Sequence, residues 1–239
     1  MTVHRRAQLE PAYLLHQRPW RESSLIVDFF ASEHGRLALV AKGVRRPKSA
    51  MRGVLQPFCL LSISFSQRSE LGTLTAAEID QRPVIPPSES LLSAYYVNEL
   101  ILRLLERNDP HGDLFAHYSE TINRLSAGDS PAPVLRIFEK RLLQALGYGL
   151  ELRCDVHSGE PLDPLATYEY RLEQGPVATL KGSAASLAFS GQSLIALAAE
   201  TLTDPESLRD ARRLLMAALD LYLNDRPLNT RKVMRAMRR

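Results

Sequence analysis

The chain has 239 residues, of which 45% are hydrophobic and 24% charged, a composition typical of a globular protein with one or two domains. Only two cysteines are present, which argues against a secreted disulfide framework. No apolar run approaches the roughly 18 to 20 residues that span a bilayer, and the N-terminus lacks an uninterrupted apolar signal-peptide core. We therefore expect a soluble cytoplasmic protein.

The net charge of +3 is unevenly distributed along the chain. Residues 1–80 carry 11 basic and 7 acidic side chains, whereas residues 81–225 carry 13 basic and 20 acidic ones. The last segment, residues 226–239, has 6 basic side chains and no acidic one. We expect anionic partners to bind at the two basic ends.

The first eighty residues predict five β-strands separated by turn signals. In the fourth, Cys59, Leu61, Ile63 and Phe65 alternate with residues of the opposite face. Five short antiparallel strands suit a small closed barrel, and the OB-fold is a five-stranded barrel that binds nucleic acid. An SH3-like barrel is the alternative, and periodicity does not separate the two. The predicted strands span residues 13–17, 25–30, 36–42, 58–66 and 71–79.

A basic loop follows the third predicted strand. No Asp or Glu occurs from Gly35 through Ser69, and Pro47 breaks regular structure, so we expect a mobile loop. A polyanion whose phosphates are neutralised by Lys and Arg explains this charge most simply. The alternative is a solvated, disordered surface loop. The basic residues of this acid-free span are Arg36, Lys42, Arg45, Arg46, Lys48, Arg52 and Arg68.

The rest of the chain predicts helices interrupted by a small hairpin. Arg82-Pro83 and Pro86-Pro87 indicate a linker, so we expect an OB-fold domain at residues 1–82 and a helical domain at residues 83–239, with a loop and hairpin insertion at about residues 148–186. Asp204-Pro205-Glu206 is a strong helix start. The predicted fold class is α+β. The helices are expected at residues 89–107, 112–125, 133–147, 193–200, from 205 onward and at 228–239, with strands at 168–172 and 177–180.

Motifs of catalysis and of nucleotide binding are missing from the sequence. The patterns GxxxxGK[ST], GxGxxG, HExxH and GxSxG do not occur, so we expect no catalytic residue and no enzyme. The Gly147-Tyr148-Gly149 run predicts the end of a helix rather than a ligand site. Cys154 and His157 have the spacing of half a zinc site, but the second half is missing, so we predict a structural loop without metal.

Two further features allow a functional and a structural interpretation. Trp20 lies near Arg18 and Arg21, which suits a base-stacking platform, but a Trp that packs the end of the barrel fits equally well. Arg231, Arg235 and Arg238 follow helical spacing in the basic tail. Cations at a helix C-terminus complement the helix dipole, yet six of them without one acid exceed that need and favour contact with an anion.

Four segments together resemble one family. YLLHQRPWRESSLIVDFF, GRLALVAKGVRRPKS, LQPF and LGYGLELRCDVHSGEP, in this order, are similar to the bacterial RecO recombination mediators, and the resemblance covers essentially the whole chain. It implies an N-terminal OB-fold, a helical C-terminal domain, and no cofactor. It also implies binding of single- and double-stranded DNA, annealing of complementary strands, and association with the nucleoid during repair.

The resemblance also implies partners and a loop structure. The family acts with RecR to load RecA onto DNA coated by single-strand-binding protein (SSB), and it binds the acidic, hydrophobic C-terminal tail of SSB through its helical domain. Some members carry a four-cysteine zinc site after L-G-Y-G. This chain keeps only Cys154 there, so it resembles the zinc-free branch, and we expect packing to hold the small hairpin.

We expect two sets of binding residues on this basis. Phosphate contacts are expected from the basic loop, with the hairpin arginines as outer contacts: Arg36, Lys42, Arg45, Arg46, Lys48, Arg52, Arg18 and Arg21. The SSB tail needs cations beside an apolar groove, and Arg136, Lys140 and Arg141 are the candidates, with an exposed helix face as the competing interpretation. A DNA-binding regulator and a non-catalytic basic scaffold remain the alternatives for the whole protein.

Overall fold

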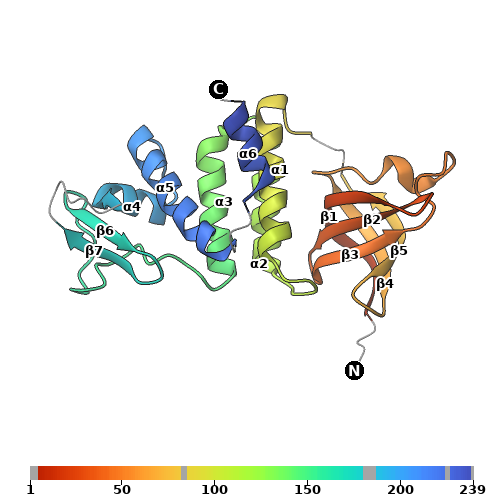
Figure 1. The fold of residues 1–239 in the computed structure, drawn as a ribbon, viewed down its shortest axis with the longest axis horizontal. Helices are drawn as coiled ribbons and strands as arrows, with labels where there is room; N and C mark the ends of the chain where they lie inside the picture. Colours follow the sequence, from red (N-terminus) through yellow and green to blue (C-terminus); the bar gives the residue numbers. More distant parts are fainter. Residues whose placement is uncertain (1–4, 82–84, 180–186, 224–226, 238–239) are drawn as a thin grey trace. The chain divides into compact units, whose positions relative to one another are not determined.

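The computed structural model describes residues 5–81, 85–179, 187–223 and 227–237 of the chain (Figure 1). These residues belong to two compact units, one of residues 1–129 and 228–239 and one of residues 130–227. The α+β class is confirmed, while the domain boundary expected after residue 82 stays a prediction. Across the described ranges, none of the helices is long and apolar enough to cross a membrane.

Five strands of the first unit close into a barrel in the order β1-β2-β3-β5-β4. All five expected strands are present, but one detail of the expectation is wrong, because β3 pairs with β5 in parallel. The reason is geometric: strand direction cannot alternate all the way round a closed ring with an odd number of members. The strands are β1 (Arg5–Trp20), β2 (Ser24–Ala31), β3 (Gly35–Ala41), β4 (Leu60–Gln67) and β5 (Gly72–Ile79).

Alternate residues of the strands fill the interior of the barrel. On β4 the inward set is Leu61, Ile63 and Phe65, preceded by Cys59, as the two-residue period predicts. Val27 and Phe29 of β2 and residues 37, 39 and 41 of β3 join the same core. The residues between them consequently lie on the outer face of the barrel.

Among its described residues, the same unit has three helices: α1 (Ser88–Leu104), α2 (Gly112–Ser126) and α6 (Asn229–Ala236). Tyr13 lies on the outer face of β1 and packs against Phe115 and Tyr118 of α2, with ring centroids 5.6 and 5.0 Å away. Asn98 of α1 donates to the carbonyl of Leu15 (3.0 Å) and accepts from the Tyr118 hydroxyl (2.6 Å). Aromatic packing and buried hydrogen bonds thus fix the helices on one side of the barrel.

The second unit combines helices with a three-stranded sheet of order β7-β6-β8. The predicted hairpin is β6–β7, whereas β8 was not predicted. The predicted helix start at Asp204 is confirmed, since its side chain accepts from the Ser207 N–H at 2.8 Å. The elements are α3 (Pro131–Ala145), β6 (Thr167–Arg171), β7 (Gly175–Thr179), β8 (Ala188–Ser190), α4 (Gly191–Ala198) and α5 (Pro205–Tyr222).

The loop that contains Cys154 and His157 is ordered by a carboxylate. Asp155 accepts hydrogen bonds from the backbone N–H groups of Ala178 on β7 (2.7 Å), His157 (2.7 Å) and Ser158 (3.1 Å). These bonds lower the pKa of Asp155. Hydrogen bonding therefore joins this loop to the hairpin, in addition to the packing expected from the sequence. No group of three or more His, Cys, Asp or Glu able to hold a metal ion occurs within the described ranges.

Candidate nucleic-acid interface

The basic loop between β3 and β4 is built from successive turns. The N–H groups of Arg46, Ser49 and Arg52 donate to the carbonyls of Gly43, Arg46 and Ser49 at 3.0 to 3.2 Å. A short 3₁₀-helix, η1 (Ala50–Gly53), follows, and Val44 and Leu55 bury their side chains in the barrel core. The expectation of a loop without regular structure is therefore wrong for the four residues of η1, while the expected mobility of the loop stays a prediction.

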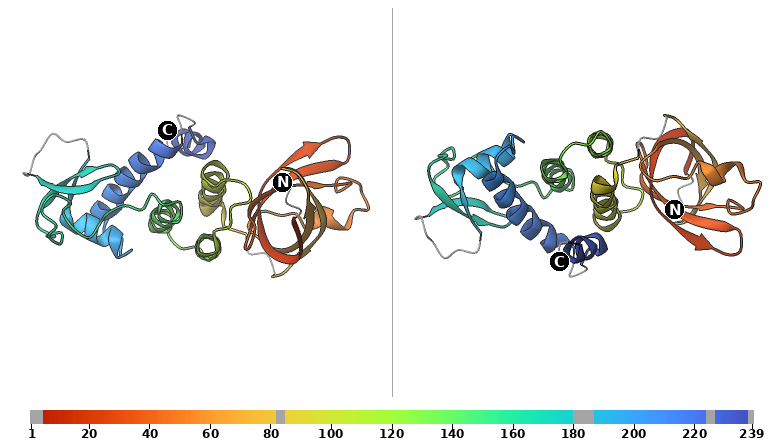
Figure 2. Two further views of the ribbon diagram at one scale, coloured as in Figure 1. Left: turned by 90° about the horizontal axis from the view of Figure 1, so that it is seen from below. Right: turned by 90° about the horizontal axis from the view of Figure 1, so that it is seen from above.

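The loop lies beside the tip of the β1–β2 hairpin. The Arg45 N–H donates to the Ser23 carbonyl at 2.9 Å, and the Gly43 N–H donates to Ser24 Oγ at 3.3 Å. Figure 2 shows the loop, in orange, on the side of the barrel away from α1 and α2. Two stretches separated by some twenty residues in sequence thus form one surface at the end of the barrel.

We call the basic side chains of this surface the basic rim. All are exposed, and within the described ranges none of them forms an ion pair with a carboxylate. The loop itself has no acidic residue, and Glu22 is the acid at the hairpin tip. Side chains of this kind attract phosphate without the cost of breaking an existing pair. The basic rim consists of Arg18, Arg21, Lys42, Arg45, Arg46, Lys48 and Arg52.

Trp20 lies at the edge of the basic rim on the last position of β1. It pairs with Ser24 of β2, and its side chain is 40% exposed. The guanidinium carbon of Arg21 is 5.9 Å from the centre of its ring, within the range of a cation–π contact. The hairpin tip therefore presents an aromatic ring together with cations, and the ring does not belong to the barrel core.

Arg36 differs from the other predicted DNA contacts. Its guanidinium donates to the carbonyls of Leu102 (2.7 Å) and Leu105 (3.0 Å) at the end of α1, and it lies 4.0 Å from Asp28. Burial lowers the pKa of Arg36, and the charge of Asp28 opposes this effect. The structure thus gives this arginine a role in joining β3 to α1, and it is not part of the basic rim.

The three predicted tail-binding cations lie on α3 in the second unit, and each already has partners. Arg136 is 8% exposed and pairs with Glu139 at 2.5 Å. Lys140 donates to the carbonyls of residues 197 and 198 at the end of α4. Arg141 makes a two-pronged contact with Glu200 at 3.1 and 2.6 Å, and Glu200 also contacts Lys140 at 3.0 Å.

The ionised state of Glu200 follows from these contacts. Burial of its carboxyl opposes ionisation, but the hydrogen bonds and charges of Arg141 and Lys140 outweigh burial and lower the pKa of Glu200. Two cations thus converge on one carboxylate. Such an arrangement already recognises a carboxylate, here one from the chain itself.

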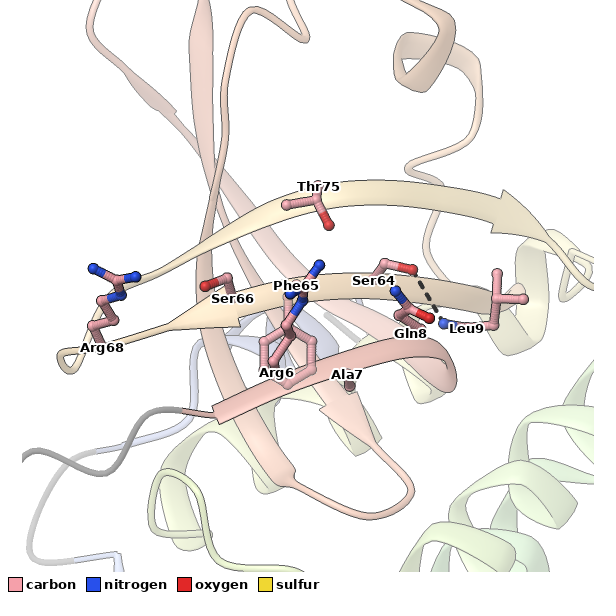
Figure 3. A pocket seen from close by; sticks show the side chains of 9 residues that line it. All are labelled: Arg6, Ala7, Gln8, Leu9, Ser64, Phe65, Ser66, Arg68 and Thr75. Atoms are coloured by element: carbon pink, nitrogen blue, oxygen red, sulfur yellow. Dashed lines mark hydrogen bonds between the residues drawn. The ribbon is translucent and has the colours of Figure 1, made fainter.

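A second set of cations lies at the other end of β1. A groove of about 440 Å³ runs over β1, β4 and β5, lined by polar and apolar side chains and by Arg6 and Arg68. Figure 3 shows both arginines beside it, and the Leu9 N–H, at a β-bulge, donates to Ser64 Oγ at 3.1 Å. Our sequence interpretation did not assign a function to either arginine, although Arg68 lies within the acid-free span.

The basic tail is only partly described. In α6, Lys232 and Arg235 are exposed, while Arg231 lies over the ring of Tyr96, 5.8 Å from its centroid. Arg238 lies outside the described residues. The tail thus has some exposed positive charge, and anion contact there stays a prediction.

Comparisons with known proteins give one family along the chain. Residues 7–82 match the family model "Recombination protein O N terminal", and residues 88–232 match "Recombination protein O C terminal". A DNA repair protein RecO from Azoarcus sp. (strain BH72) is 45% identical over 240 residues, covering 99% of both chains. The RecO proteins of Alkalilimnicola ehrlichii and Coxiella burnetii are 46% and 40% identical, over 98% and 96% of this chain and 93% and 99% of theirs.

Proposed function

The chain belongs to the RecO family of DNA repair and recombination proteins, and on that premise we propose that it binds DNA through the basic rim and mediates recombination. One observation carries the proposal: seven exposed cations from the β1–β2 hairpin and the adjoining basic loop have no carboxylate partner in the described part of the chain. Phosphates of single- and double-stranded DNA fit this surface equally. Contacts of this kind position the backbone and do not read sequence.

The proposed activity is annealing of complementary strands. Two polyanions repel each other, so a protein that joins them must screen their phosphates and leave the bases free to pair. The basic rim supplies the screening through sequence-independent contacts and the release of counterions. This mechanism requires no catalytic residue and no cofactor.

The proposal includes the partners that the family resemblance implies. We propose that the protein acts with RecR to load RecA onto single strands coated by SSB. For the acidic C-terminal tail of SSB we propose Lys140 and Arg141 as the contact, because they already hold the Glu200 carboxylate. In this proposal the terminal carboxylate of the tail replaces Glu200. The buried Arg136 does not contact the tail, and it stabilises α3 through its ion pair with Glu139.

The test is annealing of complementary oligonucleotides coated with SSB. In the variant Arg45→Ala/Arg46→Ala/Lys48→Ala, three phosphate contacts are lost, so we expect at least a tenfold slower annealing rate at unchanged melting temperature. The slope of log affinity for single strands against log salt should fall by about 2, since each contact contributes roughly 0.7. The matched control is Arg107→Ala/Arg153→Ala/Arg209→Ala, which removes the same charge from exposed positions elsewhere.

Each outcome distinguishes the proposal from its alternatives. Equal losses in the rim variant and the control would indicate a general charge effect and contradict the assignment to the basic rim. Absence of any salt-dependent DNA binding in the wild type would contradict the proposal and favour the non-catalytic basic scaffold. A strong preference for one duplex sequence would favour the DNA-binding regulator.

A further inference from the structure

We propose that Trp20 is a base-stacking site, on which one unstacked base of a single strand lies flat while the neighbouring phosphates contact Arg18 and Lys42. The inference rests on the proposed DNA binding and names single strands as the ligand class of this part of the surface. It deepens that function, because phosphate contacts alone bind single strands and duplexes without distinction.

Strand register places the three side chains on one face. Residues of β2 and β3 that point into the core, such as Val27 and Leu39, pair with each other. Trp20 pairs with Ser24, and Arg18 pairs with Ile26 one step further along the same outer face. Lys42 directly follows β3, and the Gly43 N–H beside it is bonded to Ser24 Oγ.

The spacing of this face suits a nucleotide. The β2–β3 register ends at Leu25 and Ala41, and its continuation by one residue brings Lys42 opposite Ser24. Because Ser24 also pairs with Trp20, the backbones of Trp20 and Lys42 are then two strand spacings apart, roughly 10 Å. Arg18 is two residues from Trp20 on the same strand, roughly 7 Å along it. An exposed ring thus has a cation on each of two sides, which is the arrangement that stacks a base and holds the phosphates next to it.

Exposure argues against a purely structural role for the ring. The barrel core is filled by aliphatic residues and by Phe29 and Phe65, and Trp20 is outside it. A large aromatic side chain that is exposed to solvent does not gain the stabilisation that burial would give. Arg21 lies near the ring, as in sites where a base stacks on an aromatic residue that an arginine supports.

A single strand is the ligand that fits this ring. In a duplex both faces of each base are covered by their neighbours, so a surface ring finds no free base to stack on. Bases of a single strand are readily splayed out and stacked on aromatic side chains. Stacking at Trp20 would therefore favour single strands over duplexes at equal phosphate contact.

The chain contains one tryptophan, so its fluorescence reports on this site alone. We expect an oligo-dT single strand to quench the emission of the wild-type protein on binding. An oligonucleotide of equal length made of abasic sites carries the same phosphates, and we expect it to leave the emission nearly unchanged. A duplex should quench much less than the single strand.

Affinity measurements with three variants complete the test. Trp20→Ala should weaken binding of the single strand by about 5-fold to 160-fold, the range expected for loss of one stacked base. Its affinity for the abasic strand and its salt slope should stay unchanged. Trp20→Phe should recover most of the loss. Tyr148→Ala is the control, since it removes a ring of similar exposure from the second unit.

The results separate this inference from the proposed function. If DNA of every kind fails to bind, the proposed function itself is wrong. If binding is salt-dependent but the emission is unaffected and Trp20→Ala binds as the wild type does, the function stands and the stacking site is refuted. If the abasic strand binds more weakly while Trp20→Ala is normal, the base contacts lie elsewhere, and the inference is equally refuted.

Discussion

Gly35 allows close contact between the barrel and the loop that connects α1 to α2. It lies at the start of β3 with φ of +66°, and a Cβ there would be 1.9 Å from the Asp109 carbonyl oxygen. We expect Gly35→Ala to lower the free energy of unfolding by more than 2 kcal/mol, since left-handed backbone costs roughly 1–2 kcal/mol for a non-glycine residue and the clash adds to it. Urea unfolding measures this change.

Two other glycines of the same unit separate the cost of the left-handed backbone from the cost of the clash with Asp109. Gly128 has φ of +89° but open space around it, and Gly53 has open space and no positive φ. We expect Gly128→Ala to cost about 1 kcal/mol through the backbone alone and Gly53→Ala to cost almost nothing. A loss for Gly35→Ala no greater than that for Gly128→Ala would show that the contact with Asp109 relaxes freely.

For single residues, the sequence predicts well where uncompensated positive charge lies, but it predicts poorly which charged side chains are buried. The exposure of Arg45, Arg46 and Lys48 followed from a loop without acids, because nothing nearby neutralises them. Arg36 belongs to the same acid-free span, yet it is bound to carbonyls of α1. Arg136 on α3 is likewise buried. Strand and helix periods give the face on which a side chain lies, but not which distant element covers that face.

Among the elements, α6 depends on a carboxylate from another helix. Glu99 of α1 accepts from the N–H groups of Asn229 (2.9 Å) and Thr230 (2.9 Å) and from the Thr230 hydroxyl (2.7 Å). These groups form the first turn of α6, which has no capping side chain of its own. Burial opposes ionisation of Glu99, but these bonds and Arg103 outweigh it and lower its pKa.

We expect Glu99→Gln to lower the free energy of unfolding by about 1–3 kcal/mol at pH 7, since it replaces charge-assisted hydrogen bonds at a helix N-terminus. Because the pKa is lowered in the folded state, the stabilisation is fully present above the ordinary value of 4.5 and is lost as pH falls through the folded value. The difference between wild type and variant should therefore shrink below pH 4.5.

Urea titrations at neutral and acid pH check this, with Glu89→Gln as the control on the exposed side of α1. Glu89 has no bond to α6 among the described contacts, so we expect a change of only a few tenths of a kcal/mol there. A pH-independent cost for Glu99→Gln would mean that the shape of the side chain matters and its charge does not.

Elements with a clear hydrophobic period or capping signal were predictable from the sequence. Elements that form only because another strand pairs with them were not. The inward set of β4 and the start of α5 at Asp204 follow from local pattern and capping. The short strand β8 has only three residues, too few to show a period, and it forms because β6 offers a free edge. The parallel pairing of β3 with β5 results from closure of the barrel, and the sequence of a single strand does not determine that closure.

Over the whole molecule, charge divides between the two units. Residues 1–129 with 228–239 carry 20 basic and 14 acidic side chains, and residues 130–227 carry 10 and 13. The first unit thus has a net charge of +6 and the second of −3. A positive unit suits a polyanion such as DNA. A negative unit binds an acidic peptide only where cations are concentrated, as Lys140 and Arg141 are around Glu200.

The proposed binding of DNA and the proposed binding of the SSB tail should therefore be separable by mutation. We expect Glu200→Gln to raise the affinity for a labelled SSB tail peptide, because the competing carboxylate is removed, and Arg141→Gln to lower it about tenfold or more. Both should leave affinity for single strands unchanged, whereas the triple rim variant should lose DNA affinity and keep peptide affinity. Fluorescence anisotropy with each of the two ligands measures the affinities of all three variants. Weaker peptide binding by Glu200→Gln would contradict the replacement of Glu200 by the tail, because it would mean that Glu200 supports the site and does not compete for it. Unchanged peptide binding in both variants would place the tail on another surface.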